Sequence, residues 1–333
     1  MHNKRSTFSG KLGFVLSAAG ASVGLGNIWR FPYLAAKYGG GIFLLIYIVL
    51  ALTFGYTMII AETTLGRMTK KSPVGAFHTF AKTKFASFSG WINAIIPILI
   101  VPYSSVIGGW VIKYLFEYLK GDAKLLATDT YFSNFISNGV STEICFILFT
   151  LFTLAIIYAG VQNGIERVSK FMMPVLVVLS VIIAGYSISR PGAFEGVKYF
   201  LIPNFDNFSW MTVVSAMGQM FYSLSIAMGI LITFGSYMKK DVSIEGSTEN
   251  VEIFDTAIAI MAGLMIIPAV FSFSGGNMET LKAGPSLMFI TIPKVFKYGT
   301  RHRYRYHFLL VGVICSYHKL YCANRKCCIH IPR

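Results

Sequence analysis

Long apolar stretches follow one another along this chain and are separated by short polar loops. They run over residues 12–36, 41–66, 88–118, 143–161, 167–189, 209–237 and 253–275. Each is close to or above the roughly 20 residues that a helix needs to cross a bilayer. The next segment, 278–296, is more polar and is interrupted by Gly284, Pro285 and Pro293, which predicts a hairpin of short helices at the outer surface. The pattern predicts an all-α membrane protein with about seven transmembrane helices.

Basic residues in the loops predict how these helices are oriented. Four loop regions on one side carry most of them: Lys4, Arg5 and Lys11; Arg67, Lys70, Lys71, Lys82 and Lys84; Arg167 and Lys170; Lys239 and Lys240. Loops rich in Lys and Arg stay in the cytoplasm. We therefore expect a multi-pass protein of the cytoplasmic (plasma) membrane with a cytoplasmic N-terminus.

The composition agrees with a membrane protein. Charged residues make up 13% of the 333 residues and hydrophobic residues 55%, whereas soluble domains carry about 25% charged residues. The net charge of +15 does not indicate a nucleic-acid partner, because eight of the 29 Lys and Arg lie from Lys297 onward and most others lie in the loops. A soluble protein with a large core would not repeat bilayer-length runs. We find no nucleophile–base pair, so an enzyme is not expected.

The first and sixth apolar stretches contain unusual numbers of glycines. The first stretch has three glycines in the run from Gly20 to Asn27. The sixth stretch has Gly218 and Gly229 around the polar run that ends at Ser225. A glycine costs a helix about 1 kcal/mol. Close helix packing through small residues would account for either stretch taken alone. Two such stretches five apart favour instead a pair of broken helices in an inverted repeat, with a first repeat at 12–189 and a partial second repeat at 209–296.

Several motifs together resemble one family. The run from Gly24 to Pro32 is similar to the first-helix signature of the neurotransmitter:sodium symporters. The similarity continues at Gly39 to Gly41, Glu62 to Arg67, Gly108 to Trp110, Gly164 to Lys170, Gln219 to Ser225 and Ala283 to Pro293. It covers about residues 5–296, which form the transporter-like domain 1–296. The resemblance implies a 5+5 inverted-repeat fold with broken helices 1 and 6. It also implies sodium-coupled symport of a neutral amino acid or related small amine by alternating access.

The resemblance also implies which residues bind the ions and the substrate. The first sodium site would use the Ser22 carbonyl, Asn27, Ser223 and Asp255. The second would use the carbonyls of Gly20 and Val23 and groups of an eighth helix. The substrate would contact Ala21, Ser22, Gly24, Gly26, Ser104, Tyr222, Ser223, Ser225 and Met228. Arg30 would belong to the outer gate, with Glu62, Gln219 and Arg5 as supporting residues. Free backbone groups at helix breaks suit both a carboxylate and a cation.

Two acidic residues inside apolar stretches can be interpreted in two ways. Glu62 and Asp255 could each lie at a helix end with the carboxylate in water. By the family resemblance, Glu62 instead accepts hydrogen bonds from unwound backbone, and Asp255 stands where some relatives have a sodium-binding Asn. Chloride-dependent relatives carry a neutral residue there. A carboxylate would supply the negative charge itself, so we expect that chloride is not required.

Ser104 departs from the family pattern. Relatives usually have a tyrosine there, and its hydroxyl holds the substrate carboxylate. The neighbouring Tyr103 lies about 100° away around a helix and cannot replace it. Serine reaches less far, so we expect weaker or water-bridged binding or a bulkier substrate.

The family resemblance ends after Phe296. Residues 297–333 hold four of the six histidines and four of the five cysteines. Read one nucleotide later, the run from Arg301 to His307 becomes Ile or Thr codons alternating with Gly, Ala, Val or Asp codons, as at the start of an apolar helix. We therefore expect a disordered, frameshift-derived tail. A metal site is the alternative, but the spacing of the Cys and His residues matches no zinc pattern.

A chain truncated after the seventh helix would not transport alone. The other possibility is a non-transporting fragment or a partner of full-length copies.

Overall fold

Membrane-length helices make up most of the structure, a computed structural model that describes residues 7–24, 26–80, 83–276, 284–291 and 293. Five are long and apolar enough to cross a membrane: Gly41–Thr69, Lys84–Lys120, Gly139–Tyr158, Val161–Ile188 and Glu245–Ser274. A sixth candidate is the pair Lys11–Ser22 and Gly26–Lys37, which is bent by 52°. The count of five or six spans rests on the length and composition of the helices, and this number fits a multi-pass membrane protein.

The helices follow the predicted stretches in order. They are α1 (Lys11–Ser22), a π-helical turn Gly26–Arg30, α2 (Phe31–Lys37), α3 (Gly41–Leu50), a π-helical turn Ala51–Gly55, α4 (Tyr56–Thr69), α5 (Pro73–Phe80), α6 (Lys84–Lys120), α7 (Ala123–Leu126), α8 (Asp129–Ser137), α9 (Gly139–Tyr158), a π-helical turn Val161–Glu166, α10 (Arg167–Ile188), α11 (Ala193–Leu201), a 3₁₀ turn Phe205–Asn207, α12 (Trp210–Ser223), α13 (Ile230–Ser236), α14 (Glu245–Ser274) and a π-helical turn Leu287–Thr291.

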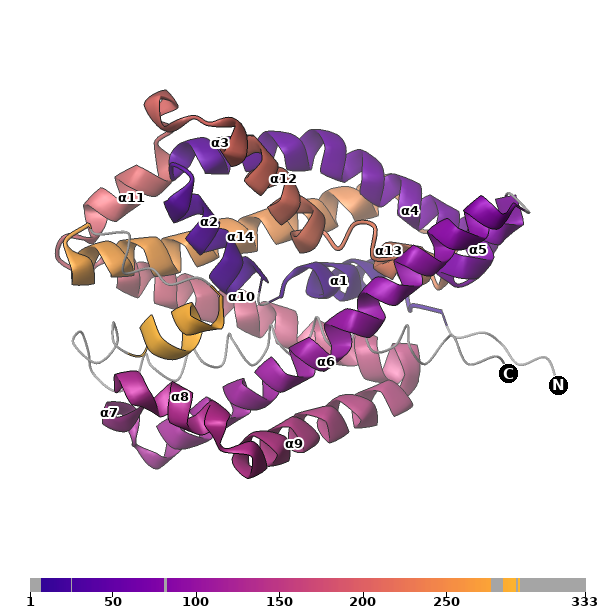
Figure 1. Cartoon of the computed structure of the whole chain (residues 1–333). Helices are drawn as coiled ribbons and strands as arrows, with labels where there is room; N and C mark the ends of the chain where they lie inside the picture. The colour runs from indigo at the N-terminus through magenta and orange to yellow at the C-terminus, as the bar shows by residue number, and fades with distance from the viewer. Residues whose placement is uncertain (1–6, 25, 81–82, 277–283, 292, 294–333) are drawn as a thin grey trace.

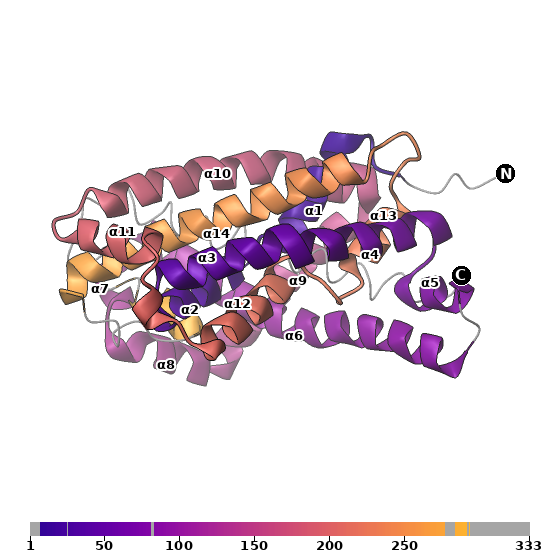
Figure 2. The same ribbon diagram turned by 90° about the horizontal axis from the view of Figure 1, so that it is seen from above.

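Three short helices of the broken stretches, α1, α2 and α13, are largely buried, whereas α12 exposes Trp210 and Val214. Figures 1 and 2 show α1 in the middle, with α14 and α10 along one side and α6 crossing the other. Helix α9 runs beside α6 at the periphery and exposes Ile144, Leu148 and Leu151. Exposed apolar side chains on a membrane-length helix face lipid. Most described residues of the two breaks are buried, whereas Ala227 in the second break is exposed.

The predicted stretches differ from the structure most at the start of α14 and in the segment 278–296. The predicted span 209–237 is not among the spans counted above, because it is divided into the short helices α12 and α13. Helix α14 begins at Glu245 and not near residue 253. Its early acidic residues suit the positive end of the helix dipole, so the helix extends beyond the apolar run. In the predicted outer hairpin, Leu287, Met288 and Phe289 are buried, and the Phe289 ring stacks on Phe132 at 5.2 Å. Residues 277–283 and 294–296 of that hairpin, the tail 297–333 and Arg5 lie outside the described residues.

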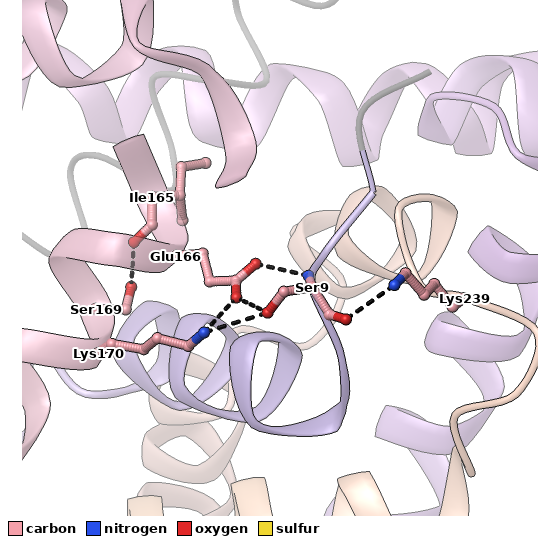
Figure 3. Close-up of polar contacts among 6 residues, drawn as sticks. All are labelled: Ser9, Ile165, Glu166, Ser169, Lys170 and Lys239. Carbon is pink, nitrogen blue, oxygen red and sulfur yellow. Dashed lines mark hydrogen bonds and ion pairs between the residues drawn. The ribbon is translucent and has the colours of Figure 1, made fainter. Parts of the chain in front are cut away.

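The segment before α1 is fastened to three parts of the bundle. The Phe8 ring packs edge-on against Phe14, Phe234 and Tyr237. Ser9 donates to Glu166 from its backbone N–H at 2.8 Å and from its hydroxyl. Figure 3 shows Lys170 at the same carboxylate, with Nζ 2.6 Å from Oε1, and Lys239 donating to the Ser9 carbonyl at 2.9 Å. We call Phe8 and Ser9 with these partners the N-terminal strap.

Candidate functional site

The first broken stretch is interrupted between α1 and the π-helical turn Gly26–Arg30. The Val23 N–H still bonds to the Ala19 carbonyl at 2.7 Å, and the Asn27 N–H bonds to the Gly24 carbonyl at 3.0 Å. Gly26 packs directly against the Tyr222 ring of α12, and a Cβ on Gly26 would overlap that ring. Glycine at this position therefore allows the first and sixth stretches to touch.

The second broken stretch is interrupted between α12 and α13. Ser225, Ala227 and Gly229 have φ values of 56°, 60° and 62°, a left-handed conformation that costs a residue with a Cβ roughly 1–2 kcal/mol. The Ala227 N–H donates to Glu62 Oε1 of α4 at 2.6 Å. Glu62 is buried, so its carboxylate satisfies a backbone donor that the break removes from the helix.

Between the two breaks lies a cluster of buried polar side chains around Asp255 of α14. Asp255 Oδ1 accepts from Asn27 Nδ2 at 2.9 Å, and Oδ2 accepts from the Ser223 hydroxyl at 2.7 Å. The Tyr47 hydroxyl of α3 donates to Oδ2 at 3.2 Å. Ser223 Oγ also lies 3.1 Å from Asn27 Oδ1. All four side chains are fully buried. We call these four residues the Asp255 cluster.

The Asp255 cluster has the chemistry of a sodium site. Hard cations take carboxylate, amide and hydroxyl oxygens as ligands, and Asp255, Asn27 and Ser223 offer one of each kind. A carboxylate buried in a membrane-length helix is costly to keep charged. A cation bound between these oxygens would offset that cost, so the residues fit the ion that the sequence predicts.

Two hydrogen bonds made by other predicted residues connect the two breaks. The Ser225 hydroxyl donates to the Ala21 carbonyl at 3.2 Å, and Gln219 Nε2 donates to the Gly26 carbonyl at 3.3 Å. Gly24 and Met228 lie in the breaks themselves and are buried. Ser22 is also buried, but its hydroxyl donates to the Ala18 carbonyl within α1, at 3.2 Å.

Arg30 contacts α12, whereas Ser104, Gly20 and Val23 make no side-chain hydrogen bond to the Asp255 cluster within the described part of the chain. The Arg30 guanidinium lies over the Tyr222 ring, 5.3 Å from its centroid, and donates to the Gly218 carbonyl at 3.4 Å. Ser104 is buried in α6. Gly20 and Val23 are buried at the end of α1. Their roles in binding stay predictions.

Sequence reasoning missed two residues near Asp255. Tyr47 could not be recognised from the sequence, because a tyrosine in an apolar stretch resembles any other aromatic core residue. Glu252 was missed because the predicted stretch began at residue 253. It is 3% exposed and stands one turn before Asp255 on α14, and its Oε1 has no hydrogen-bond partner among the described residues. An acidic residue in an otherwise apolar helix would have been the signal.

Comparisons with known proteins agree with this geometry. The model of the sodium:neurotransmitter symporter family matches residues 5–134 and 132–302. The sodium-dependent transporter YhdH of Bacillus subtilis is 35% identical over 293 residues, which are 87% of this chain and 64% of YhdH. A sodium-dependent transporter of Haemophilus influenzae is 32% identical and is covered to 67%. The crystal structure of MhsT with L-phenylalanine superposes with a TM-score of 0.84 at 35% identity, over 97% of this chain and 73% of MhsT.

The match to these proteins is partial in length. The chain spans 64%, 67% and 62% of three prokaryotic relatives, and 56% of the sodium- and chloride-dependent GABA transporter 2 of Rattus norvegicus, to which it is 27% identical. Activities of whole relatives therefore do not pass directly to these 333 residues.

Proposed function

This chain belongs to the sodium:neurotransmitter symporter family, and from that premise we propose that its two broken helices bind sodium and a neutral amino acid, or a related small amine, for sodium-coupled symport by alternating access. The Asp255 cluster is the observation that carries the proposal. It joins the first break through Asn27 and the second through Ser223. An ion held there would hold both breaks in one arrangement, which links ion binding to the shape of the substrate site.

The energy for uphill transport would come from the ions. Each sodium ion contributes about 2.3 kcal/mol per 100 mV of membrane potential and about 1.4 kcal/mol per tenfold gradient. The first sodium site would consist of Ser22, Asn27, Ser223 and Asp255. The second would use the carbonyls of Gly20 and Val23 and groups from outside this chain.

The substrate would lie along the two breaks. Backbone N–H groups at the start of a half-helix attract a carboxylate, and Gly26 begins the turn that leads into α2. The hydrogen bond between Ser225 and Ala21 joins the two breaks beside it. Tyr222 and the Arg30 guanidinium over its ring would close the site on the outer side. The short side chain of Ser104 would hold the substrate carboxylate loosely or through a water molecule.

Chloride would not be needed. The negative charge beside the first sodium ion would be the carboxylate of Asp255, which is fixed in the protein. The rat GABA transporter 2 is named as sodium- and chloride-dependent, so the difference is testable within one family.

Binding and transport should separate in this chain. Purified residues 1–333 should bind a radiolabelled neutral amino acid more tightly with sodium than with choline, and Asn27→Ala should remove that difference. Alternating access needs one bundle of helices to move against a scaffold, and about a third of the length of YhdH has no counterpart in this chain. In liposomes with an inward sodium gradient, residues 1–333 should therefore not accumulate amino acid. Sodium-independent binding would refute the proposed site. Uptake above that of empty liposomes would refute only the proposal of inactivity.

A further inference from the structure

Two adjoining grooves lie where the span Gly41–Thr69 begins. One, of about 430 Å³, is apolar and runs along α3 past Ile42, Leu45, Ile46 and Val49 to Phe205 and Phe208. The other, of about 360 Å³, is lined by polar side chains that include Glu195, Lys198, Asn204 and Asn207. In Figures 1 and 2 the chain between α11 and α12 passes over the start of α3. Residues of that connection line both grooves.

A single 3₁₀ turn, Phe205–Asn207, builds one wall of each groove. Side chains three residues apart in a 3₁₀ turn lie on the same side. Asn204 and Asn207 therefore face the polar groove together, and Phe205 and Phe208 face the apolar groove. Residues 42, 45, 46 and 49 form one face of α3 by helical periodicity. The apolar and polar grooves thus meet along one edge.

Both grooves are formed by backbone that is held in place. Gly40 and Pro203 form an antiparallel bridge, and the Tyr199 hydroxyl donates to the Ala36 carbonyl at 2.7 Å. A Cβ on Gly41 would overlap the Ile202 carbonyl. These contacts fix residues 199–203 against the start of α3, so an occupant would meet a preformed site.

The position and charges of the grooves identify the occupant. Trp210 is 79% exposed beside them, and Phe194 and Ile202 are exposed on and just after α11, as is typical of aromatic and amphipathic residues at a membrane surface. The polar groove holds a positive and a negative side chain, Lys198 and Glu195, whose Nζ and Oε1 are 3.3 Å apart. A headgroup with both charges complements this pair, whereas an anionic headgroup would also meet Glu195.

We propose that these grooves bind one zwitterionic phospholipid of the phosphatidylethanolamine class. The phosphate lies at Lys198 and the side-chain amides of Asn204 and Asn207, and the ammonium lies at Glu195. One acyl chain follows the apolar face of α3. With a cytoplasmic N-terminus this is an outer-leaflet site. The proposal depends on membrane insertion and on no step of transport.

The apolar groove is tested by filling it. The full chain is purified in mild detergent, incubated with equal amounts of phosphatidylethanolamine and phosphatidylglycerol, washed, and analysed for retained lipid by native mass spectrometry. We expect one phosphatidylethanolamine per chain. Leu45→Trp should lower its retention about tenfold, while Leu148→Trp on the lipid-facing side of α9 should not. Equal retention by both variants, or no retained lipid, would overturn the proposal.

The headgroup is tested separately by the exposed pair. Glu195→Gln combined with Lys198→Gln should preserve the fold, because both side chains are largely exposed, and should abolish the preference for phosphatidylethanolamine over phosphatidylglycerol. An unchanged preference would contradict the assigned headgroup contacts. If the native chain is instead a lipid-free dimer that Leu45→Trp converts to a monomer, a second copy occupies the groove and the proposal is wrong.

Discussion

At the scale of single residues, the charge of Asp255 is the feature on which the proposed sodium site depends. Its two carboxylate oxygens are the meeting point of Asn27, Ser223 and Tyr47. A neutral residue of the same shape would keep an oxygen ligand but leave the sodium ion without its fixed negative partner.

The substitution Asp255→Asn should therefore weaken sodium binding by at least about tenfold, or ~1.4 kcal/mol, in chloride-free buffer. Added chloride should recover part of the loss, because an anion could replace the missing charge. Sodium titration of the native chain and of Asp255→Asn, each in chloride and in gluconate, measures this. A native chain that itself requires chloride would contradict the role given to Asp255.

The residues of this site were predictable to different degrees. Asn27, Ser223 and Asp255 stand in polar or glycine-rich interruptions of apolar stretches, so both the pattern and the family resemblance point to them. Tyr47 has no such signal, since only the three-dimensional structure brings its hydroxyl to Asp255. The hydroxyl of Ser22 likewise turns to its own helix, which no sequence spacing reveals.

At the scale of elements, α4 and α13 pack through glycines at very short distance. A Cβ on Gly66 would overlap the Ile232 carbonyl, and a Cβ on Gly235 would overlap the Thr63 backbone. This contact holds the half-helix α13 beside Glu62, the residue that caps the break through Ala227.

Gly66→Ala should destabilise the protein by about 1–3 kcal/mol, because the added methyl group forces two backbones apart. Gly185→Ala is the matched control: that glycine lies in helix α10 and has nothing within 4 Å of an added Cβ. Alanine there should be neutral or stabilising by up to about 1 kcal/mol. Thermal unfolding in detergent compares them, and equal midpoints would show that the α4–α13 contact is not tight.

The N-terminal strap is a second element-scale feature. Glu166 is buried and binds Ser9 and Lys170, and a Cβ on Gly13 of α1 would overlap its carboxyl group. The strap thereby joins α1 to the start of α10 (Figure 3).

Glu166→Ala should release the strap, since Ser9 and Lys170 both lose their acceptor. Limited proteolysis should then cut the N-terminal segment several times faster than in the native chain, because cleavage follows the population of the open form. Glu195→Ala, which removes an acid from an exposed ion pair on α11, is the control and should leave the rate unchanged. Equal cleavage of all three proteins would mean that Glu166 does not hold the segment.

The broken helices were the most predictable elements, because several glycines close together inside an apolar stretch weaken a continuous helix. The strap was not predictable, because nothing in the sequence around Phe8 and Ser9 indicates a distant partner, and Glu166 is more than 150 residues away from Ser9. The start of α14 was placed too late because helix hydrogen bonding continues into polar sequence where apolar periodicity ends.

At the scale of the whole molecule, the family was predictable from the sequence, and the comparisons confirm it. The described helices also follow the predicted stretches in order. The division into repeats at 12–189 and 209–296 stays a prediction. The tertiary arrangement explains why the Asp255 cluster forms: the π-helical turn Gly26–Arg30, α3, α12 and α14 approach one another only in the folded bundle. The proposed first sodium site uses residues of this chain alone, so the proposal can be tested without the remaining length of the relatives.

Sodium binding to the purified chain in lipid nanodiscs tests the central claim most directly. Radioactive sodium should bind saturably, with potassium failing to compete at equal concentration. Asp255→Ala should abolish this binding, whereas Asp206→Ala, at an exposed acid in the 3₁₀ turn Phe205–Asn207, should not alter it. Saturable binding of equal affinity in the native chain and in Asp255→Ala would contradict the sodium site at the two broken helices.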